Sequence, residues 1–167
     1  MEAAAQKPPW PWYVRVIAGK NPLFTLMRTL VWAALIIVLF KYVLVGIRVR
    51  GESMEPTFHD GQVKFVNQLA YLRSTPKRGD VVAVRAPGLR AVFLKRIVGL
   101  PGEHVSIRRG AVYINDQKLE EPYARGSTSY LAEFTLEPHE YWVIGDNRAV
   151  SEQWRKFDYS IIGKMIQ

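Results

Sequence analysis

A serine in a tight turn is the first side chain in the sequence that could do chemistry. Ser53 lies in Gly51–Thr57 (GESMEPT), where a glycine and a proline enclose a turn from which its hydroxyl can project. A serine hydroxyl becomes a nucleophile when a nearby base removes its proton. Taken alone, the residue is more typical of a loop serine that caps a backbone group.

A lysine in the apolar stretch 93–98 (FLKRIV) could be that base. If the stretch is a strand, alternation places Lys95 on one face with Phe93 and Ile97. An amine desolvated in this way has a pKa below its ordinary value of about 10.4 and can accept a proton. The alternative is a lysine on an edge strand whose ammonium reaches water.

A third polar segment, 145–151 (GDNRAVS), follows the apolar run 141–144 and could form a hydrogen-bonding corner at the end of a strand. An ordinary Asp-Asn turn is the alternative. The chain has no cysteine, and its three histidines are scattered and never spaced as a ligand pair. Thiol chemistry is therefore excluded, and we expect neither a metal site nor another cofactor.

The elements that would position these side chains are short strands. β-branched runs separated by glycine, proline and Asn-Asp turns are typical of strands, and no long helix intervenes between them. We therefore expect a mainly β fold, an antiparallel sheet or barrel, in which the polar stretch 120–136 is an extended loop. The predicted strands are Gln62–Asn67, Asp80–Arg85, Ala91–Gly99, His104–Arg108, Ala111–Ile114 and Tyr141–Ile144.

An apolar segment near the N-terminus predicts one transmembrane helix before the β domain. Residues 29–47 contain a single cation, Lys41, and approach the roughly 20 residues that cross a bilayer as a helix. A buried helix of a soluble protein is the alternative, whereas a cleaved signal peptide is disfavoured because residues 44–46 lack the small-x-small pattern. The predicted organisation is a short basic segment (1–28), an anchor (29–47) and a β-rich domain (48–167). Cations flank the anchor on both sides, so charge does not fix its orientation.

The chain is basic, with 23 lysines and arginines against 15 acidic residues and a formal net charge of +8. Such a balance is typical of proteins that bind nucleic acid or an anionic membrane surface. The cations are spread along the chain, and no zinc finger, RNP-like motif or basic helix accompanies them. A nucleic-acid-binding module would also leave the apolar segment unexplained, so we expect a membrane partner and no nucleic acid.

Taken together, these segments resemble those of the type I signal peptidases, membrane-bound serine proteases that use a Ser–Lys pair. They occur in the family's order and cover nearly everything after residue 47. The matching segments are Gly51–Thr57, Arg78–Val82 (RGDVV), Lys95–Glu103 (KRIVGLPGE), Gly145–Ser151 and the closing Ile161–Lys164 (IIGK).

The resemblance implies roles for the residues of the pair and their neighbours. Ser53 would be the nucleophile of an acyl-enzyme mechanism, with its own backbone N–H holding the oxyanion. Lys95 would be the general base, and Ser151 would hydrogen-bond and orient the lysine amine.

The resemblance also implies supporting residues. Asp146 and Arg96 would form an ion pair that braces the site. Met54 and Pro56 would shape the turn that binds the substrate.

The sequence departs from the family pattern in two places. Some members carry a serine hydroxyl two positions before the nucleophile, where this chain has Gly51, so that oxyanion donor is absent. After Ser151, Gln153 and Trp154 stand where the family has Asp-Ser, so an Asp–Arg brace is missing unless Glu152 supplies the carboxylate.

The substrates and location follow from the same resemblance. The partners would be preproteins with small residues at positions −1 and −3 of the signal peptide, the phospholipid membrane and the protein translocation machinery. The enzyme would cross the bacterial cytoplasmic membrane once, with its N-terminus inside and its catalytic domain outside. The mitochondrial inner membrane is the alternative location.

Two other protein classes share parts of this pattern. Self-cleaving repressors have the same sheet core and a Ser–Lys pair, but they carry a DNA-binding domain or stay soluble. A pseudoenzyme that keeps the fold and only binds signal peptides would explain the changes at Gln153 and Trp154. The intact Ser53, Lys95 and Ser151 favour the enzyme.

Overall fold

The computed structural model describes residues 11, 22–85, 91–128, 131–151, 154–155 and 160–166. They fall into two units, 1–41 and 42–167, which are described separately. The first unit contains the helix α2 (Pro22–Val38), which continues as a π-helical segment η1 (Leu39–Val43). From Leu23 to Val43 this helix has 21 residues, and it is long and apolar enough to cross a membrane.

The helix differs at both ends from the predicted anchor, residues 29–47. It begins before Thr29, because the cation Arg28 interrupts the apolar sequence but not the helical backbone. It ends at Val43, and the following residues form strand β1 (Leu44–Arg48), which pairs antiparallel with β2 (Val63–Asn67). Hydrophobicity alone cannot separate the end of an apolar helix from an apolar strand that follows it directly.

The second unit is mainly β, as predicted. Its larger sheet has seven strands in the order β1-β2-β11-β3-β4-β9-β10, and every strand pair that the structure describes is antiparallel. Each strand predicted from a β-branched run is present. The remaining strands of this sheet are β3 (Val81–Arg85), β4 (Val92–Gly99), β9 (Trp142–Ile144), β10 (Trp154–Arg155) and β11 (Ser160–Met165).

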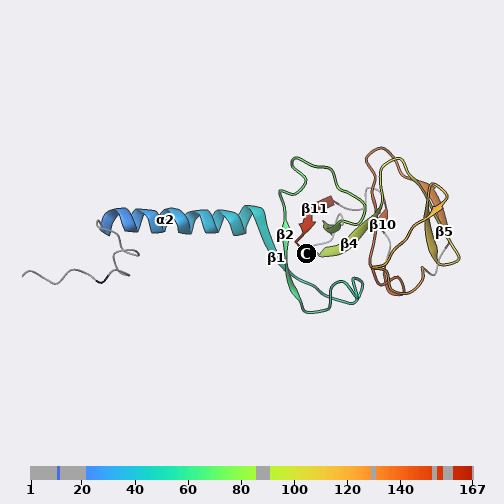
Figure 1. The fold of residues 1–167 in the computed structure, drawn as a ribbon, viewed down its shortest axis with the longest axis horizontal. Helices are drawn as coiled ribbons and strands as arrows, with labels where there is room; N and C mark the ends of the chain where they lie inside the picture. The colour runs from blue at the N-terminus through green and yellow to red at the C-terminus, as the bar shows by residue number, and fades with distance from the viewer. Residues whose placement is uncertain are drawn as a thin grey trace, which may run out of the picture. The chain divides into compact units, whose positions relative to one another are not determined.

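A smaller, four-stranded sheet lies between β4 and β9 in the sequence. In Figure 1 its strand β5 lies at the end of the β unit away from β1 and β2. The order is β7-β6-β5-β8, with β5 (His104–Arg108), β6 (Ala111–Ile114), β7 (Gln117–Lys118) and β8 (Ala132–Thr135). The prediction that 120–136 is a loop is wrong at β8, because Ala132 and Phe134 pack on the apolar core while the strand pairs with β5.

The apolar core occupies both faces of the larger sheet. On one face Val81, Ala83 and Leu94 pack with Met54, and on the opposite face the neighbouring strand positions of β3 and β4 form a separate cluster. A third cluster joins the two sheets. This cluster is formed by Val98, Val105, Ile107, Val112, Ile114, Leu136, Trp142 and Ile144.

Candidate active site

Ser53 lies in the turn between β1 and β2. Gly51 has a φ of +84°, a left-handed conformation that glycine adopts without strain, and its N–H donates to Asp60 Oδ1 at 2.7 Å. The next residue after the serine, Met54, is 1% exposed and packs into the core. The turn is therefore anchored on both sides of Ser53, which is half-buried.

Lys95 is 3% exposed on strand β4, directly opposite Val82 of β3. Phe93 and Ile97 pack in the cluster that contains Val82, whereas Leu94 belongs to the cluster on the other face. The predicted alternation along this strand is confirmed, and it places the lysine on the face of β4 that carries Phe93 and Ile97.

Ser53 and Lys95 line the same cleft, which has a volume of about 520 Å³. A second cavity of about 360 Å³ shares the serine and Phe93 with it and extends along residues 47–51 and 91–94. The structure thus brings together two residues that are far apart in sequence. Pro56 is exposed and lines neither of these two cavities, whereas Met54 lines the second.

The corner after β9 contacts the backbone of Ser53. The carbonyl of Ser53 accepts a hydrogen bond from the N–H of Asn147 and another from Ser151 Oγ, both at 3.0 Å. A Cβ on Gly145 would lie well under 3.0 Å from Ser151 Oγ and from that carbonyl, so only glycine fits there. The family resemblance implies that Ser151 orients Lys95; in the structure its hydroxyl donates to the carbonyl of Ser53.

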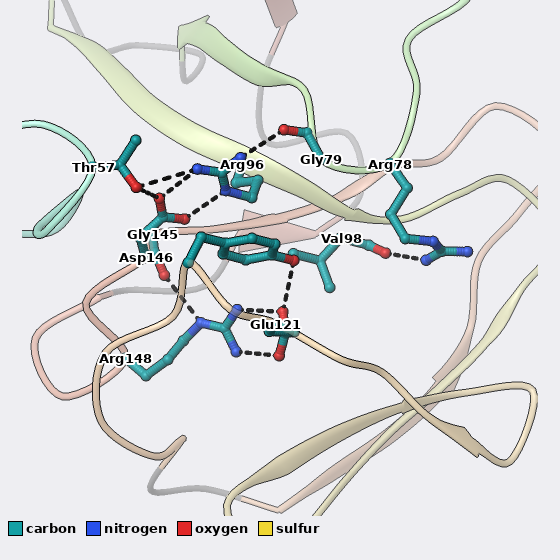
Figure 2. Close-up of polar contacts among 10 residues, drawn as sticks. Thr57, Arg78, Gly79, Arg96, Val98, Glu121, Gly145, Asp146 and Arg148 are labelled. Carbon is teal, nitrogen blue, oxygen red and sulfur yellow. Dashed lines mark hydrogen bonds and ion pairs between the residues drawn. The ribbon is translucent and has the colours of Figure 1, made fainter.

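Arg96 and Asp146 form a buried ion pair beside this corner (Figure 2). Arg96 Nε donates to Asp146 Oδ1 at 2.8 Å, and Nη2 donates to Oδ2 at 2.6 Å. Thr57 Oγ1 donates to Asp146 Oδ2 at 2.5 Å, and Arg96 Nη1 donates to the carbonyl of Gly79 at 2.7 Å. The pair therefore ties strand β4 to the corner and to the serine turn.

A second buried ion pair lies next to the first, and sequence reasoning missed it. Arg148 Nη1 and Nη2 donate to Glu121 Oε2 and Oε1 at 2.8 and 2.5 Å. Burial lowers the pKa of Arg148, but the hydrogen bonds and charge of Glu121 raise it by more. Burial and Glu121 together raise the pKa of Tyr123, whose ring lies 4.1 Å from the guanidinium of Arg96. No spacing or motif in the sequence links Glu121 to a residue 27 positions later.

Two of the other motif segments, 78–82 and 95–103, contact each other at the C-terminal end of β4. Arg78 Nη2 lies 2.5 Å from Glu103 Oε1, and Arg78 Nη1 also donates to the carbonyl of Val98. Glu103 Oε2 accepts from the N–H of Leu100 at 2.7 Å. These contacts fix the strand that carries the lysine.

Of the positions that depart from the family pattern, Gln153 and Glu152 lie outside the described residues. Trp154 belongs to β10 and is paired with Val143 of β9. Among the residues that the structure describes, no group of three His, Asp or Glu side chains could hold a metal ion.

The family model and the sequence relatives identify the family of this chain. The family model described as "Signal peptidase, peptidase S26" matches residues 23–164. A signal peptidase I of Bacillus caldolyticus is 30% identical over 172 aligned residues, covering 94% of this chain and 85% of that protein. The signal peptidase I of Bacillus licheniformis is 30% identical over 141 residues, covering 77% and 76%. A solved signal peptidase I from Enterococcus faecalis is 27% identical, covers 55% of this chain and 97% of that chain, and has a TM-score of 0.47.

Proposed function

This chain belongs to the signal peptidase family, peptidase S26, and is therefore a serine protease that removes signal peptides; we propose that Ser53 is its nucleophile and Lys95 its general base. The observation that carries this proposal is that both residues line one cleft. Lys95 is 3% exposed on the face of β4 that carries Phe93 and Ile97, and desolvation disfavours an ammonium. Such burial favours the neutral amine that a general base needs.

The reaction proceeds through an acyl-enzyme. Lys95 Nζ takes the proton of Ser53 Oγ as this oxygen attacks the carbonyl carbon of the residue at position −1. The backbone N–H of Ser53 donates to the oxyanion that forms. The C–N bond then breaks, and the lysine ammonium gives its proton to the amine of the mature protein. Water, deprotonated by the same lysine, hydrolyses the ester.

The substrate binds as an extended strand along the cavity next to Ser53. This cavity is lined by residues 47–51 and by residues 91–94, which lie at the start of β4 and just before it. A peptide lying in this cavity would run alongside residues 91–94, with small side chains at positions −1 and −3 facing the cavity and backbone hydrogen bonds holding the chain in place.

The apolar helix anchors the enzyme in the bacterial cytoplasmic membrane. A basic N-terminal segment lies in the cytoplasm, the helix crosses once, and the β unit acts outside, where translocated preproteins emerge from the translocation machinery. Holding enzyme and preprotein on one membrane raises their effective concentration.

The experiment that tests this function is cleavage of a preprotein with an Ala-x-Ala site, in detergent or lipid vesicles. Wild type is compared with Ser53→Ala and with Lys95→Met, which keeps an apolar stem of similar length. Matched controls are Ser74→Ala and Lys118→Met, both at exposed positions. Circular dichroism reports whether each variant is folded.

We expect wild type and both controls to cut after the −1 alanine and both site variants to be inactive. Cleavage by folded Ser53→Ala would assign the nucleophile to another residue. A folded wild type that binds signal peptides without cutting any would make the chain a scaffold rather than an enzyme.

A further inference from the structure

The corner formed by residues 145–147 sets the position of the Ser53 backbone. The N–H of Asn147 donates to the carbonyl of Ser53, and Gly145 lies so close to this carbonyl that a Cβ has no room. A shift of the corner therefore carries the serine hydroxyl with it. Whatever holds the corner decides where that hydroxyl lies in the cleft.

Arg148 holds the corner through its own backbone and side chain. Its Nε donates back to the carbonyl of Gly145 at 3.1 Å. Its N–H donates to the carbonyl of Arg125, whose own N–H donates to the carbonyl of Asp146, each at 2.8 Å. The side chain of Arg148 is 3% exposed, and a buried guanidinium keeps such a position only when its charge and donors are paired.

Glu121 supplies that pairing. Its carboxylate accepts from both terminal nitrogens of Arg148, a two-point contact that fixes the plane and direction of the guanidinium (Figure 2). The same carboxylate accepts from the hydroxyl of Tyr123 at 3.0 Å, and the ring of this tyrosine lies against the guanidinium of Arg96. Glu121 thus connects the two buried arginines of the site.

We propose that Glu121 is a positioning residue for Ser53, acting through Arg148 and the corner 145–147. The proposal deepens the proposed function and rests on Ser53 being the nucleophile. Neither Glu121 nor Arg148 lines either cavity. Loss of Glu121 therefore lowers turnover without weakening substrate binding.

The first test is the steady-state kinetics of Glu121→Gln in the full chain, with the same preprotein. This variant keeps the size of the side chain but leaves Arg148 without its counter-charge. We expect kcat to fall about 10- to 100-fold, the range for a small misplacement of a reacting group, while KM stays unchanged. Glu121→Asp, which keeps the charge, recovers part of kcat. Glu120→Gln is the matched control at an exposed neighbour and keeps wild-type kcat.

A second variant separates positioning from stability. Glu121→Leu/Arg148→Met replaces the buried ion pair by apolar side chains, an exchange that is often neutral or stabilising for the fold. We expect a melting temperature near that of wild type together with a low kcat. Ser53→Ala is measured in parallel, because activity in that variant would refute the nucleophile assignment whatever Glu121 does.

Wild-type kcat in a folded Glu121→Gln or in the folded double variant would overturn the proposal. So would a raised KM with unchanged kcat, since that places Glu121 in substrate binding. If Glu121→Gln fails to fold, the double variant decides, and if that also fails, the recovery by Glu121→Asp decides.

Discussion

At Gly145 a single methyl group would disturb the contacts of Ser53 and Ser151 together. A Cβ there meets the Ser53 carbonyl and the Ser151 hydroxyl at less than 3.0 Å, and one of the two is backbone that cannot simply rotate away. The proximity that brings the nucleophile to the corner is thus the reason for a glycine at this position. Glycine is required at position 145 because neighbouring atoms leave no room for a Cβ, and not because of the φ angle of this residue.

Gly145→Ala is therefore expected to reduce the cleavage rate by about 100-fold, since the added methyl displaces the serine turn. We expect a loss of about 1–3 kcal/mol in the free energy of unfolding from the overpacked corner. Gly46→Ala is the control, because its Cβ would make an ordinary contact with Phe65 at 3.6 Å. Cleavage and thermal melting of both variants check this expectation. Equal cleavage rates for the two alanine variants would show that the corner accommodates the added methyl group without moving Ser53.

Ser151→Ala removes one of the two donors to the Ser53 carbonyl. We expect a cleavage rate lower by about 100-fold, the cost of a small misplacement of the reacting hydroxyl. The rate is compared with that of Ser74→Ala, whose exposed hydroxyl donates only to a nearby loop carbonyl, that of Ala70. An unchanged rate in Ser151→Ala would remove this serine from the site.

Residue types and spacing were enough to single out Ser53, Lys95 and the 145–151 corner, because their motifs are local in sequence. The ion pair of Glu121 with Arg148 could not be predicted in this way. Its partners come from two segments whose proximity depends on how the smaller sheet packs against β9. Long-range pairing of charges is a result of the fold and leaves no local pattern.

At the scale of elements, Asp80 ties strand β11 to the segment before β3. Its carboxylate accepts from Tyr71 Oη at 2.9 Å and from the N–H of Lys77 at 3.1 Å, and it lies 2.7 Å from Lys164 Nζ. Burial raises the pKa of Asp80, but these hydrogen bonds and the Lys164 charge lower it by more, so the net pKa lies below the ordinary 3.8.

A lowered carboxyl pKa stabilises the folded state at pH values above the unfolded pKa, and this contribution is lost as the pH falls through the folded pKa. Asp80→Asn should therefore lower the free energy of unfolding by about 1 kcal/mol or less near pH 7, because Lys164 is partly exposed. The difference from wild type should shrink as the pH falls below the ordinary carboxyl pKa of 3.8 and through the lower pKa of the folded state. Denaturant unfolding at pH 7 and across the acidic range measures it, with the exposed Asp116→Asn as control. A difference that does not change with pH would contradict the assignment.

The elements were predictable where the sequence pattern is strong. The β-branched runs gave β2 to β6 and β9, because half-buried strands need such side chains on alternating positions. Strand β1 cannot be separated from the helix in the sequence, because its apolar residues continue the helical run without a break. Strand β8 cannot be recognised in the sequence, because its pairing with β5, and not its composition, makes it a strand.

At the scale of the whole molecule, we predict an effect of the apolar helix that is independent of catalysis, namely retention of the protein in membranes. Val31→Arg/Leu35→Arg places two cations on one face of the helix near its middle, at about 2.5–3.5 kcal/mol each on insertion scales. We expect most of this variant to be released from membranes by an alkaline carbonate wash that retains wild type. Leu131→Arg, at an exposed position of the β unit, is the control. Retention of the double variant at wild-type levels would argue against a spanning helix.

Strand β1 begins at the residue after the helix ends, with no linker between them. Ser53 is ten residues beyond Val43. An extended chain covers at most about 3.3–3.6 Å per residue, so the serine can lie no more than about 35 Å from the end of the helix. If the helix spans the bilayer, this short and partly paired stretch limits how far Ser53 can lie from the membrane surface. The enzyme can cut only those peptide bonds that a preprotein presents within that height of the membrane, so the length of a signal peptide would be selected along with its sequence.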